Sequence, residues 1–431
     1  MKNSFLTKLS KIEKDGAVDI FNFKNSTSWI NIKNYLYTKS LQDVINTPTD
    51  NKKDFFSIIG LKLFIFSIFN YIKYIFSKEK KVLYVGAGSG IFKYKNTIYD
   101  SYFPYDELKN EKVIYFLSAE YPKKLQQFEK YLKENNVVIY SFLLAPLKII
   151  FTKIFKYFIK INIPHNLIDN FEKGFINKTQ LQTIHVKFIV AYYIYKFFLM
   201  LLNIKKAYIV SAYSNTELIA VLKEKNIEVI ELQHGLIGTV HRGYNYATKS
   251  PLLPTPNMVY VYDQFWKDEL IKAGYYTNEQ IKITGRLKYD LVNKDIKIYN
   301  NKFIVFTGQG SGFYKDIIRL FNDFENTQNK KGIKLIYIPH PNESANKINT
   351  LSSNFSSQDI IILKQKKFTT EQYIYNALAH ISIYSSCHFD AIYYKNKTYV
   401  YDSLKENPME YYIKEFPNRF IAIKSIKDIK L

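Results

Sequence analysis

The stretch Ile227-Glu-Val-Ile-Glu-Leu-Gln-His-Gly235 is an apolar, alternating run that ends abruptly on a Gln-His-Gly turn. A run of this length, rich in Val and Ile, is typical of an inner strand of a parallel sheet. Ligands of such sheets bind beyond the carboxyl ends of the strands. We therefore predict that this strand delivers His234 to a binding site, and that Gly235 lets a substrate approach the main chain. The alternative for a lone histidine is a core residue bonded to a carbonyl group.

The length and composition of the chain indicate a globular protein of two domains. A chain of 431 residues is too long for one domain with a single hydrophobic core. Its composition, with 47% hydrophobic and 23% charged residues, is typical of globular chains. The formal charge of +23 suits an anionic membrane surface or nucleic acid. Lysines are spread along the whole sequence, however, and no helix-turn-helix, zinc or RNA-binding signature is present. We therefore expect no nucleic-acid partner.

Cysteine content and the first residues indicate the compartment. Cys387 is the only cysteine, which excludes an internal disulfide and a cysteine-based zinc cluster and favours a reducing compartment. The lysine-rich start, residues 1–16, lacks the apolar segment of a secretory signal. We expect a cytoplasmic protein.

Apolar runs of strand length recur along the chain, and helix-length stretches separate several of them, as in a parallel α/β sheet. The predicted strands of the first domain are Lys81–Val85, Val113–Leu117, Asn136–Tyr140, Ala207–Val210, Ile227–Leu232 and Met258–Tyr262. Those of the second are Phe303–Phe306, Lys334–Ile338, Asp359–Leu363 and Ala379–Tyr384. The charged, Asn-rich stretch Asn293–Lys302 is the predicted connection, which gives domains of residues 1–295 and 296–431.

The turn Gly86-Ala-Gly-Ser-Gly90 partly matches a dinucleotide-binding fingerprint. A spaced third glycine and an acidic residue at the end of the next strand are missing. We interpret the turn as a tight strand-to-helix connection and expect no bound cofactor.

Two apolar stretches of the first domain have helical length. Phe55–Phe76 contains Lys62, Asn70 and Lys73, which favours a helix lying in the membrane interface over one that crosses the membrane. Phe188–Leu202 leads directly into a predicted strand, which favours a buried helix of the α/β domain.

A third segment, Pro146–Lys160, is a basic amphipathic helix. Its lysines gather in one arc and apolar residues fill the rest; they are Lys148, Lys153, Lys156 and Lys160. Such helices bind anionic lipid through apolar area and lysine charge. The segment fits equally well an ordinary surface helix whose lysine stems lie over apolar neighbours.

Two turns of the second domain follow its first two strands. In Thr307-Gly-Gln-Gly-Ser-Gly312, backbone N–H groups of Gly308, Gln309 and Gly310 are placed to meet a nucleotide. The next strand ends on His340-Pro341, where the proline fixes the turn and directs the histidine outward.

A third turn, Tyr384-Ser-Ser-Cys-His-Phe-Asp390, opens a helix. Ser385 and Ser386 together with the helix N-terminus form a potential phosphate site, and the alternative is plain capping. The three turns share one sheet edge, which we expect to form a cleft with His234 of the first domain.

The order His-Gly, a Gly-x-Arg-like Gly285-Arg286, His-Pro and Ser-Ser resembles the GT-B glycosyltransferases of bacterial surface polysaccharide synthesis. It is similar both to CDP-glycerol glycerophosphotransferases and to bacterial sialyl- and polysialyltransferases, and covers the chain after about Lys206. The resemblance implies two Rossmann-like domains whose parallel sheets face each other across a cleft. It also implies an acceptor-binding first domain and a donor-binding second domain. The membrane-associating helices of the first domain are predicted from the lysine pattern above.

The resemblance also implies roles for single residues. His234 matches the catalytic histidine of the glycerophosphotransferases, and Gln233, Gly235 and His241 lie on the acceptor side. The donor-binding set comprises Arg286, Gly308, Gln309, Gly310, His340, Pro341, Ser385 and Ser386. The Asp-x-Asp mark of metal-dependent glycosyltransferases is absent from the sequence, so we expect no metal.

These features predict an enzyme at the inner face of the cell membrane. The expected donor is a sugar or polyol phosphate activated by CMP or CDP, and the expected acceptor is a capsule, lipopolysaccharide or lipid-linked glycan. The anionic membrane surface is an expected partner. The alternative is a catalytically inactive, membrane-associated scaffold of the polysaccharide assembly machinery.

Overall fold

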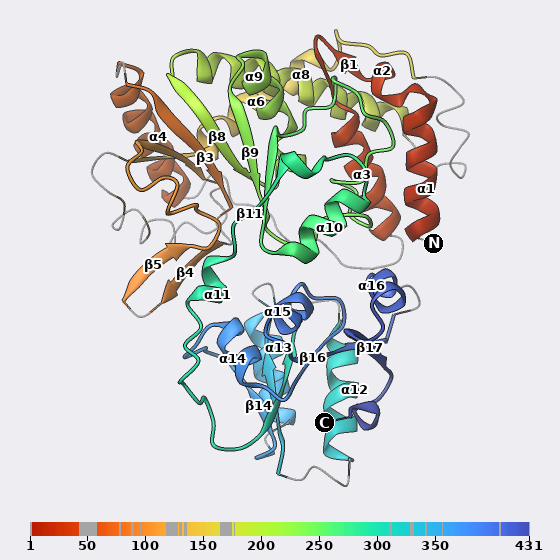
Figure 1. The fold of residues 1–431 in the computed structure, drawn as a ribbon. Helices are drawn as coiled ribbons and strands as arrows, with labels where there is room; N and C mark the ends of the chain where they lie inside the picture. The colour runs from red at the N-terminus through yellow and green to blue at the C-terminus, as the bar shows by residue number, and fades with distance from the viewer. Residues whose placement is uncertain are drawn as a thin grey trace. The chain divides into compact units, whose positions relative to one another are not determined.

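A computed structural model describes residues 2–42, 58–76, 79–87, 90–94, 96–117, 128, 132, 136–163, 175, 177–309, 313–327, 332–340, 343–355, 357–404 and 407–430. The chain divides into two compact units (Figure 1). The N-terminal unit comprises Asn3–Leu41 and Asp50–Arg286, and the C-terminal unit consists mainly of Leu287–Leu431.

The N-terminal unit contains a main parallel sheet, two short hairpins and helices. Its helices are α1 (Lys2–Ile12), α2 (Val18–Ile20), α3 (Trp29–Gln42), α4 (Ile58–Ile75), α6 (Ala145–Phe155), α8 (Lys178–Met200), α9 (Thr216–Glu224) and α10 (Gln264–Lys272). Its strands are β1 (Asn22–Phe23), β2 (Ser26–Thr27), β3 (Lys81–Gly86), β4 (Ile91–Tyr94), β5 (Thr97–Asp100), β6 (Val113–Leu117), β7 (Val137–Tyr140), β8 (Ile204–Val210), β9 (Glu228–Leu232), β10 (Met258–Val261) and β11 (Ile281–Ile283).

The seven strands of the main sheet are parallel, in the order β11-β10-β9-β8-β3-β6-β7. From β3 the chain adds β6 and β7 on one side, and then β8 to β11 on the other, as in a doubly wound Rossmann fold. The winding reverses between β3 and β8. Ligands of such folds bind beyond the carboxyl ends of the strands at this reversal.

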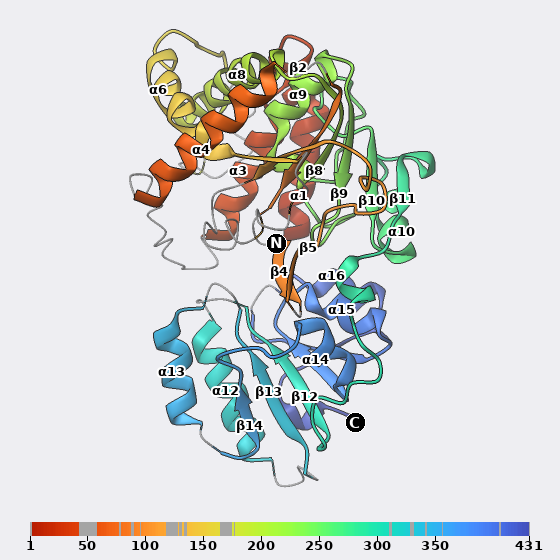
Figure 2. The ribbon, with the colours of Figure 1, turned by 90° about the vertical axis from the view of Figure 1, so that its left-hand side faces the viewer.

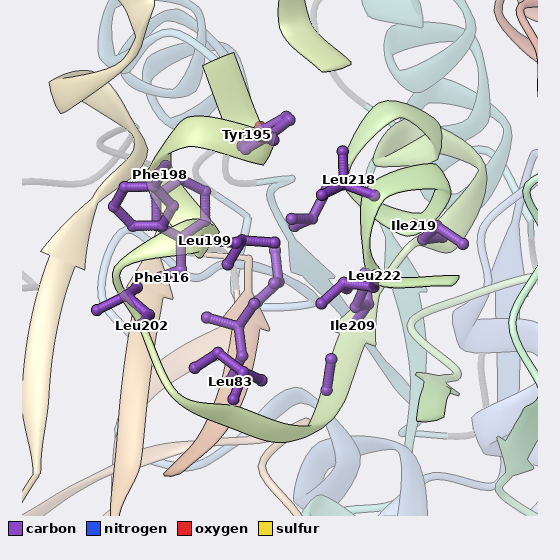
Figure 3. Packing of buried hydrophobic residues seen from close by; sticks show 14 of the residues in the cluster. Leu83, Phe116, Tyr195, Phe198, Leu199, Leu202, Ile209, Leu218, Ile219 and Leu222 are labelled. Atoms are coloured by element: carbon purple, nitrogen blue, oxygen red, sulfur yellow. The ribbon is translucent and has the colours of Figure 1, made fainter. Parts of the chain in front are cut away.

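One core of this unit lies between the sheet and helices α8 and α9. Leu83, Phe116 and Ile209 of the strands meet apolar side chains from both helices (Figure 3). Among the described helices, α8 is long and apolar enough to cross a membrane, but 56% of its most apolar window is buried inside the unit. The predicted buried helix is therefore confirmed, and it begins earlier than predicted, at Lys178.

The opposite face of the sheet carries the β4–β5 hairpin and residues 101–111. The Tyr84 hydroxyl on β3 donates to the Asp100 carboxylate at 2.7 Å and fixes the hairpin to the sheet. The predicted strand-to-helix turn at 86–90 was wrong, because the alternating residues after it pair as a hairpin. Residues 88 and 89 of that turn lie outside the described part of the chain.

The N-terminal helices, to which the sequence assigned no role, form a separate core. Helices α1 and α3 pack with the start of α8 and with Tyr246. Within this layer Glu13 and Lys33 form a buried ion pair at 2.7 Å. The Glu13 carboxylate also accepts from the backbone N–H of Ala247 at 2.9 Å. The N-terminal helices therefore hold the loop that follows His241.

The C-terminal unit contains one six-stranded parallel sheet, β14-β13-β12-β15-β16-β17. The strands are β12 (Phe303–Thr307), β13 (Lys334–Ile338), β14 (Ile360–Ile362), β15 (Ala379–Ser382), β16 (Lys397–Tyr401) and β17 (Phe420–Ile423). The helices are α11 (Leu287–Asp290), α12 (Tyr314–Glu325), α13 (Ala345–Asn354), α14 (Thr370–Asn376), α15 (Cys387–Tyr393) and α16 (Glu410–Glu415).

This second sheet is buried on both faces. On β12, Ile304 and Phe306 enter the core with α12 and α13, whereas Phe303 and Val305 enter the core with α14. Burial on both faces explains why the strand is an unbroken apolar run. The predicted α/β fold class, two Rossmann-like domains with parallel sheets, is confirmed, and β16 and β17 are strands that the sequence analysis missed.

The two units divide between Arg286 and Leu287. Tyr289 of α11 donates its hydroxyl to the Asp390 carboxylate at 2.8 Å and stacks on Tyr393 with 3.9 Å between ring centroids. The backbone N–H of Asn293 donates to Gln372 at 2.8 Å. The segment predicted to connect the domains, with its boundary at residue 295, therefore begins packed on the C-terminal unit.

Candidate functional site

His234 lies directly after β9, at the carboxyl edge of the N-terminal sheet. Its Nε2 atom is 3.3 Å from the Tyr213 hydroxyl, and its Nδ1 atom is buried with no hydrogen-bond partner among the residues that the structure describes. Burial lowers the pKa of His234 to about 4, so the imidazole is neutral at neutral pH. An unsatisfied buried nitrogen costs about 1–3 kcal/mol. It therefore indicates a position that a ligand or water completes.

Gln233 shapes the turn that carries His234. Its side-chain Nε2 donates to the Gly235 carbonyl oxygen, and its Oε1 accepts from the backbone N–H of Tyr262, both at 2.9 Å. The Tyr262 hydroxyl donates to the Gln233 carbonyl oxygen at 2.7 Å. Gln233 therefore positions the histidine. A Cβ atom added to Gly235 would meet nothing within 4 Å, so this part of the turn faces open space.

Arg286, predicted among the donor-binding residues, belongs to the N-terminal unit. Its guanidinium lies 5.1 Å from the centroid of the Tyr262 ring. Because Tyr262 is bonded to Gln233, Arg286 is connected to the His234 turn through one intervening side chain.

An aromatic cluster surrounds His234. The Tyr213 ring lies 5.9 Å from His234 and 5.0 Å from His241, and His241 lies 5.1 Å from Tyr244. A Cβ atom on Gly243 would lie 2.6 Å from the Tyr213 ring, so this contact requires glycine. Burial, together with the neighbouring Arg242 and His234, lowers the pKa of His241 well below its usual value. The structure thus places His241 and His234 against the same Tyr213 ring.

Two further features hold Tyr213 in place. Arg242 donates from Nε to Asn34 of α3 at 3.0 Å, and its guanidinium lies 5.8 Å from the Tyr213 ring. Ser211, at the end of β8, has a left-handed backbone with φ of 62°, which is unusual for a residue other than glycine. Such strain costs about 1–3 kcal/mol and concentrates at functional sites.

Glu231, three residues before His234, is a buried acid at this site. Its carboxyl group accepts from the Tyr244 hydroxyl at 2.7 Å and from the backbone N–H of Ala212 at 2.9 Å. Burial raises its pKa to about 7. The carboxyl group is therefore partly protonated near neutral pH.

The C-terminal sheet also reverses its winding, between β12 and β15. The Gln309 side chain bridges these strands, because its Oε1 accepts from the backbone N–H of Tyr384 at 2.9 Å. The Gly308 N–H donates to the Ile338 carbonyl oxygen at 2.8 Å. The turns after β12, β13 and β15 are thus joined at the edge where doubly wound sheets bind ligands.

His340 follows β13, beside a carboxylate that the sequence analysis missed. Glu343 accepts from the His340 backbone N–H at 2.7 Å and from the Tyr337 hydroxyl. Burial and the nearby Lys366 lower the pKa of His340. Glu343 occupies the backbone N–H group of His340. A Cβ atom on Gly308 would lie 2.9 Å from the backbone nitrogen of His340 and would also meet the Glu343 carboxylate, so this turn requires glycine.

The two predicted serines differ in their surroundings. The Ser385 hydroxyl accepts from the Cys387 N–H at 3.2 Å, as in a plain cap. Ser386 is exposed and is the N-cap residue of α15, without a capping hydrogen bond from its side chain. The N–H groups of His388 and Phe389 are bonded to the carbonyl oxygens of Ser385 and Ser386. The first N–H groups of α15 are therefore used within the turn.

Two predicted donor-binding residues, Gly310 and Pro341, lie outside the described residues. Within the described ranges, no three His, Cys, Asp or Glu side chains form a group that could hold a metal ion. Tyr213, Glu231 and Glu343 were missed. The sequence signal for Tyr213 is its place in the Ser-Ala-Tyr-Ser loop directly after a predicted strand. Glu231 stands out as an acid inside an apolar strand.

The chain matches no model of a known protein family. No curated protein matches it significantly in sequence. Among solved structures, it is similar to the complex of S. aureus MnaA with UDP, at 12% identity and a TM-score of 0.45, over 76% of this chain and 80% of that chain. The UDP-GlcNAc 2-epimerase from Neisseria meningitidis bound to UDP-GlcNAc aligns at 11% identity and a TM-score of 0.45, over 77% and 84% of the two chains. Similarity at this level identifies no substrate.

Proposed function

We propose that this protein is a metal-independent glycosyltransferase or polyol-phosphate transferase. Its donor is activated by CMP or CDP, and its acceptor is a capsule, lipopolysaccharide or lipid-linked glycan. The proposal is supported by the resemblance of its motifs to those of the transferases named above. One observation carries it: His234 presents a buried, unpartnered and neutral imidazole nitrogen at the carboxyl edge of a parallel sheet.

His234 is the proposed general base. An acceptor hydroxyl gives its proton to Nδ1 while its oxygen bonds to the transferred group, and the nucleotide leaves with the electron pair of the broken bond. For Nδ1 to accept a proton, Nε2 must carry the ring hydrogen and donate it to the Tyr213 hydroxyl oxygen, 3.3 Å away. Tyr213 is therefore a positioning residue that selects the tautomer.

The C-terminal unit is the proposed donor-binding domain. Its support is the set of turns joined at the winding reversal, where Gln309 and Tyr384 are linked and His340 follows the next strand. Lys366, which follows β14, adds a positive charge near His340. A cation near the leaving phosphate would stabilise the charge that develops there.

Two substitutions test the assignment of roles. His234→Ala should lower kcat by about 10²- to 10⁴-fold, the usual contribution of a general base, with nearly unchanged nucleotide affinity. His340→Ala should weaken nucleotide binding. Turnover of CMP- and CDP-activated donors and calorimetry with CMP and CDP are the measurements. Each variant serves as the control for the other. Near-parent turnover in His234→Ala would place the base elsewhere.

Tyr213→Phe tests the positioning role, because it keeps the ring and removes only the hydroxyl. We expect kcat to fall by roughly 5- to 30-fold, from the loss of one hydrogen bond of about 1–2 kcal/mol, with donor affinity unchanged.

Nucleotide choice and donor hydrolysis separate the competing functions. UDP-GlcNAc is named with the structural neighbours and belongs in the same binding series. Preference for it over cytidine nucleotides would overturn the proposed donor. A folded protein that binds nucleotide and neither transfers nor hydrolyses any donor would favour the inactive scaffold.

A further inference from the structure

Helix α6 is oriented with its apolar side outward. Ile150, Phe151, Ile154 and Phe155 are exposed, whereas Thr152 is buried. Lys148, predicted to face lipid head groups, instead donates to the Tyr195 hydroxyl at 2.6 Å. An ordinary surface helix buries its apolar stripe and exposes its polar one. The alternative of an ordinary surface helix therefore does not describe α6.

Helix α4 shows the same orientation. Its Ser67 hydroxyl accepts from the Tyr140 N–H at 3.0 Å, and Asn70 donates to the Val138 carbonyl oxygen at 2.8 Å. Both bonds satisfy backbone groups of β7, the strand at the edge of the sheet. With these polar side chains turned inward, Phe69 is 69% and Phe76 is 80% exposed.

An apolar groove of about 650 Å³ lies among α4, α6 and α8, which run close together in the N-terminal unit (Figure 2). Its lining includes Phe64, Leu147, Phe151, Phe155, Tyr193 and Phe197. The same three segments also expose Ile65 and Ile72 in α4, Tyr157 and Phe158 just after α6, and Met200 at the end of α8. Contiguous apolar surfaces of this kind mark binding sites.

The charges around the groove identify its occupant. The sequences of α4 and α8, and of residues 145–160, contain lysines and no aspartate or glutamate. Lys153 and Lys160 are exposed beside the apolar side chains of α6. Apolar area bordered by lysines complements an anionic lipid surface. A second copy of the same face would bring lysines against lysines, which disfavours self-association.

We propose that this three-helix face inserts into an anionic bilayer and that the groove takes one hydrocarbon chain of a membrane lipid. Its volume is within the range of pockets that hold one small ligand. Lysines at the rim then meet lipid phosphates, while α6 contributes apolar side chains. The proposal goes beyond the transferase function and holds for an inactive scaffold as well.

Vesicle binding tests the surface. The full-length protein should sediment with vesicles of phosphatidylglycerol and phosphatidylcholine. The double variant Phe155→Glu/Phe158→Glu, which changes exposed side chains, should bind at least about tenfold more weakly. Ile271→Glu on α10 changes an exposed residue outside the groove and should bind like the parent. Equal binding of the double variant and the parent overturns the proposal.

Tryptophan fluorescence tests the groove itself. Phe155→Trp should be quenched by phosphatidylglycerol vesicles whose lipids carry bromine on the acyl chains, whereas Ile271→Trp should not. The native Trp29 and Trp266 are buried and provide the background. Sedimentation without quenching would mean adsorption to head groups alone. A dimer in lipid-free solution that Phe155→Glu/Phe158→Glu dissociates would mean self-association; either result overturns the proposal.

Discussion

The ionisation of His234 depends on how the fold buries it. A histidine in water has a pKa of about 6.5. With that value, a histidine base would become protonated and lose activity below about pH 6.5, the acidic limb of its pH profile. Burial at the end of β9 lowers the pKa to about 4. The structure therefore moves the expected limb to more acidic pH.

At the scale of this residue, we predict that the pH profile of kcat/KM shows no acidic limb from His234 above pH 5. The neutral imidazole persists down to its pKa of about 4, because protonation requires charging a buried ring. Initial rates between pH 4 and 8, with NMR titration of the His234 ring, check this. A ring that titrates near 6.5 would show that the site is open to water.

Glu231 is predicted to make stability depend on pH in the opposite sense from an ordinary carboxyl. Its pKa is raised from 4.5 to about 7, so the folded state holds the proton more tightly than the unfolded state. The stabilisation of the folded state by this bound proton is complete below about pH 4.5 and is lost as the pH rises through 7. Glu231→Gln should therefore stabilise the protein relative to the parent at pH 8, by about 1–3 kcal/mol.

Chemical denaturation of Glu231→Gln and the parent at pH 5 and pH 8 measures the difference. Glu228→Gln makes the same change on the same strand at a more exposed position and is the matched control. A difference that does not grow with pH would mean that Glu231 is ionised in the fold.

At the scale of elements, α4 satisfies the edge of the sheet with side chains. The sequence predicted an apolar helix that contains Lys62, Asn70 and Lys73. The structure separates these polar side chains, because Asn70 turns toward β7 whereas Lys62 and Lys73 are exposed. The partner of Asn70 on β7 is known only from the structure. Edge strands otherwise present unpaired backbone groups, which favour aggregation.

We predict that Ser67→Ala destabilises the N-terminal unit by about 1–3 kcal/mol, because the buried N–H of Tyr140 loses its acceptor. Urea denaturation measures the loss. Lys73→Ala on the exposed side of the same helix is the control and should stay within about 0.5 kcal/mol of the parent. An unchanged unfolding free energy in Ser67→Ala would show that water replaces the hydroxyl.

At the scale of the whole molecule, the two units have separate hydrophobic cores. Leu83 belongs to a core of the N-terminal unit and Phe306 to a core of the C-terminal unit, and both side chains are fully buried. Domains with separate cores unfold as separate units when little couples them.

Scanning calorimetry should therefore resolve two transitions. Leu83→Ala should lower the temperature of one transition and Phe306→Ala that of the other. Each substitution should reduce the unfolding free energy of its unit by about 2–5 kcal/mol. If the proposed function is right, CMP or CDP should raise the temperature of only the transition that Phe306→Ala affects. A single transition that both variants shift equally would mean that the units unfold together.

Local sequence determined most strands of both parallel sheets, because buried parallel strands are unbroken apolar runs. The strands β11, β16 and β17 were not predicted. Local sequence also determined that His234 and His340 end strands. Short or half-exposed segments were harder to predict: the β4–β5 hairpin followed a glycine-rich turn that also fits a helix start, and β17 has only four residues.

Only the tertiary structure decided what surrounds those strand ends and which side of α4 and α6 faces outward. Tyr213 and His241 meet His234 because β8 and β9 are neighbours and the N-terminal helices hold the following loop. Helical periodicity defines a polar and an apolar stripe on a helix. Which stripe faces the protein interior is decided by the hydrogen bonds of Ser67, Asn70 and Lys148. Those partners lie far away in sequence, so the pattern within one helix does not contain them.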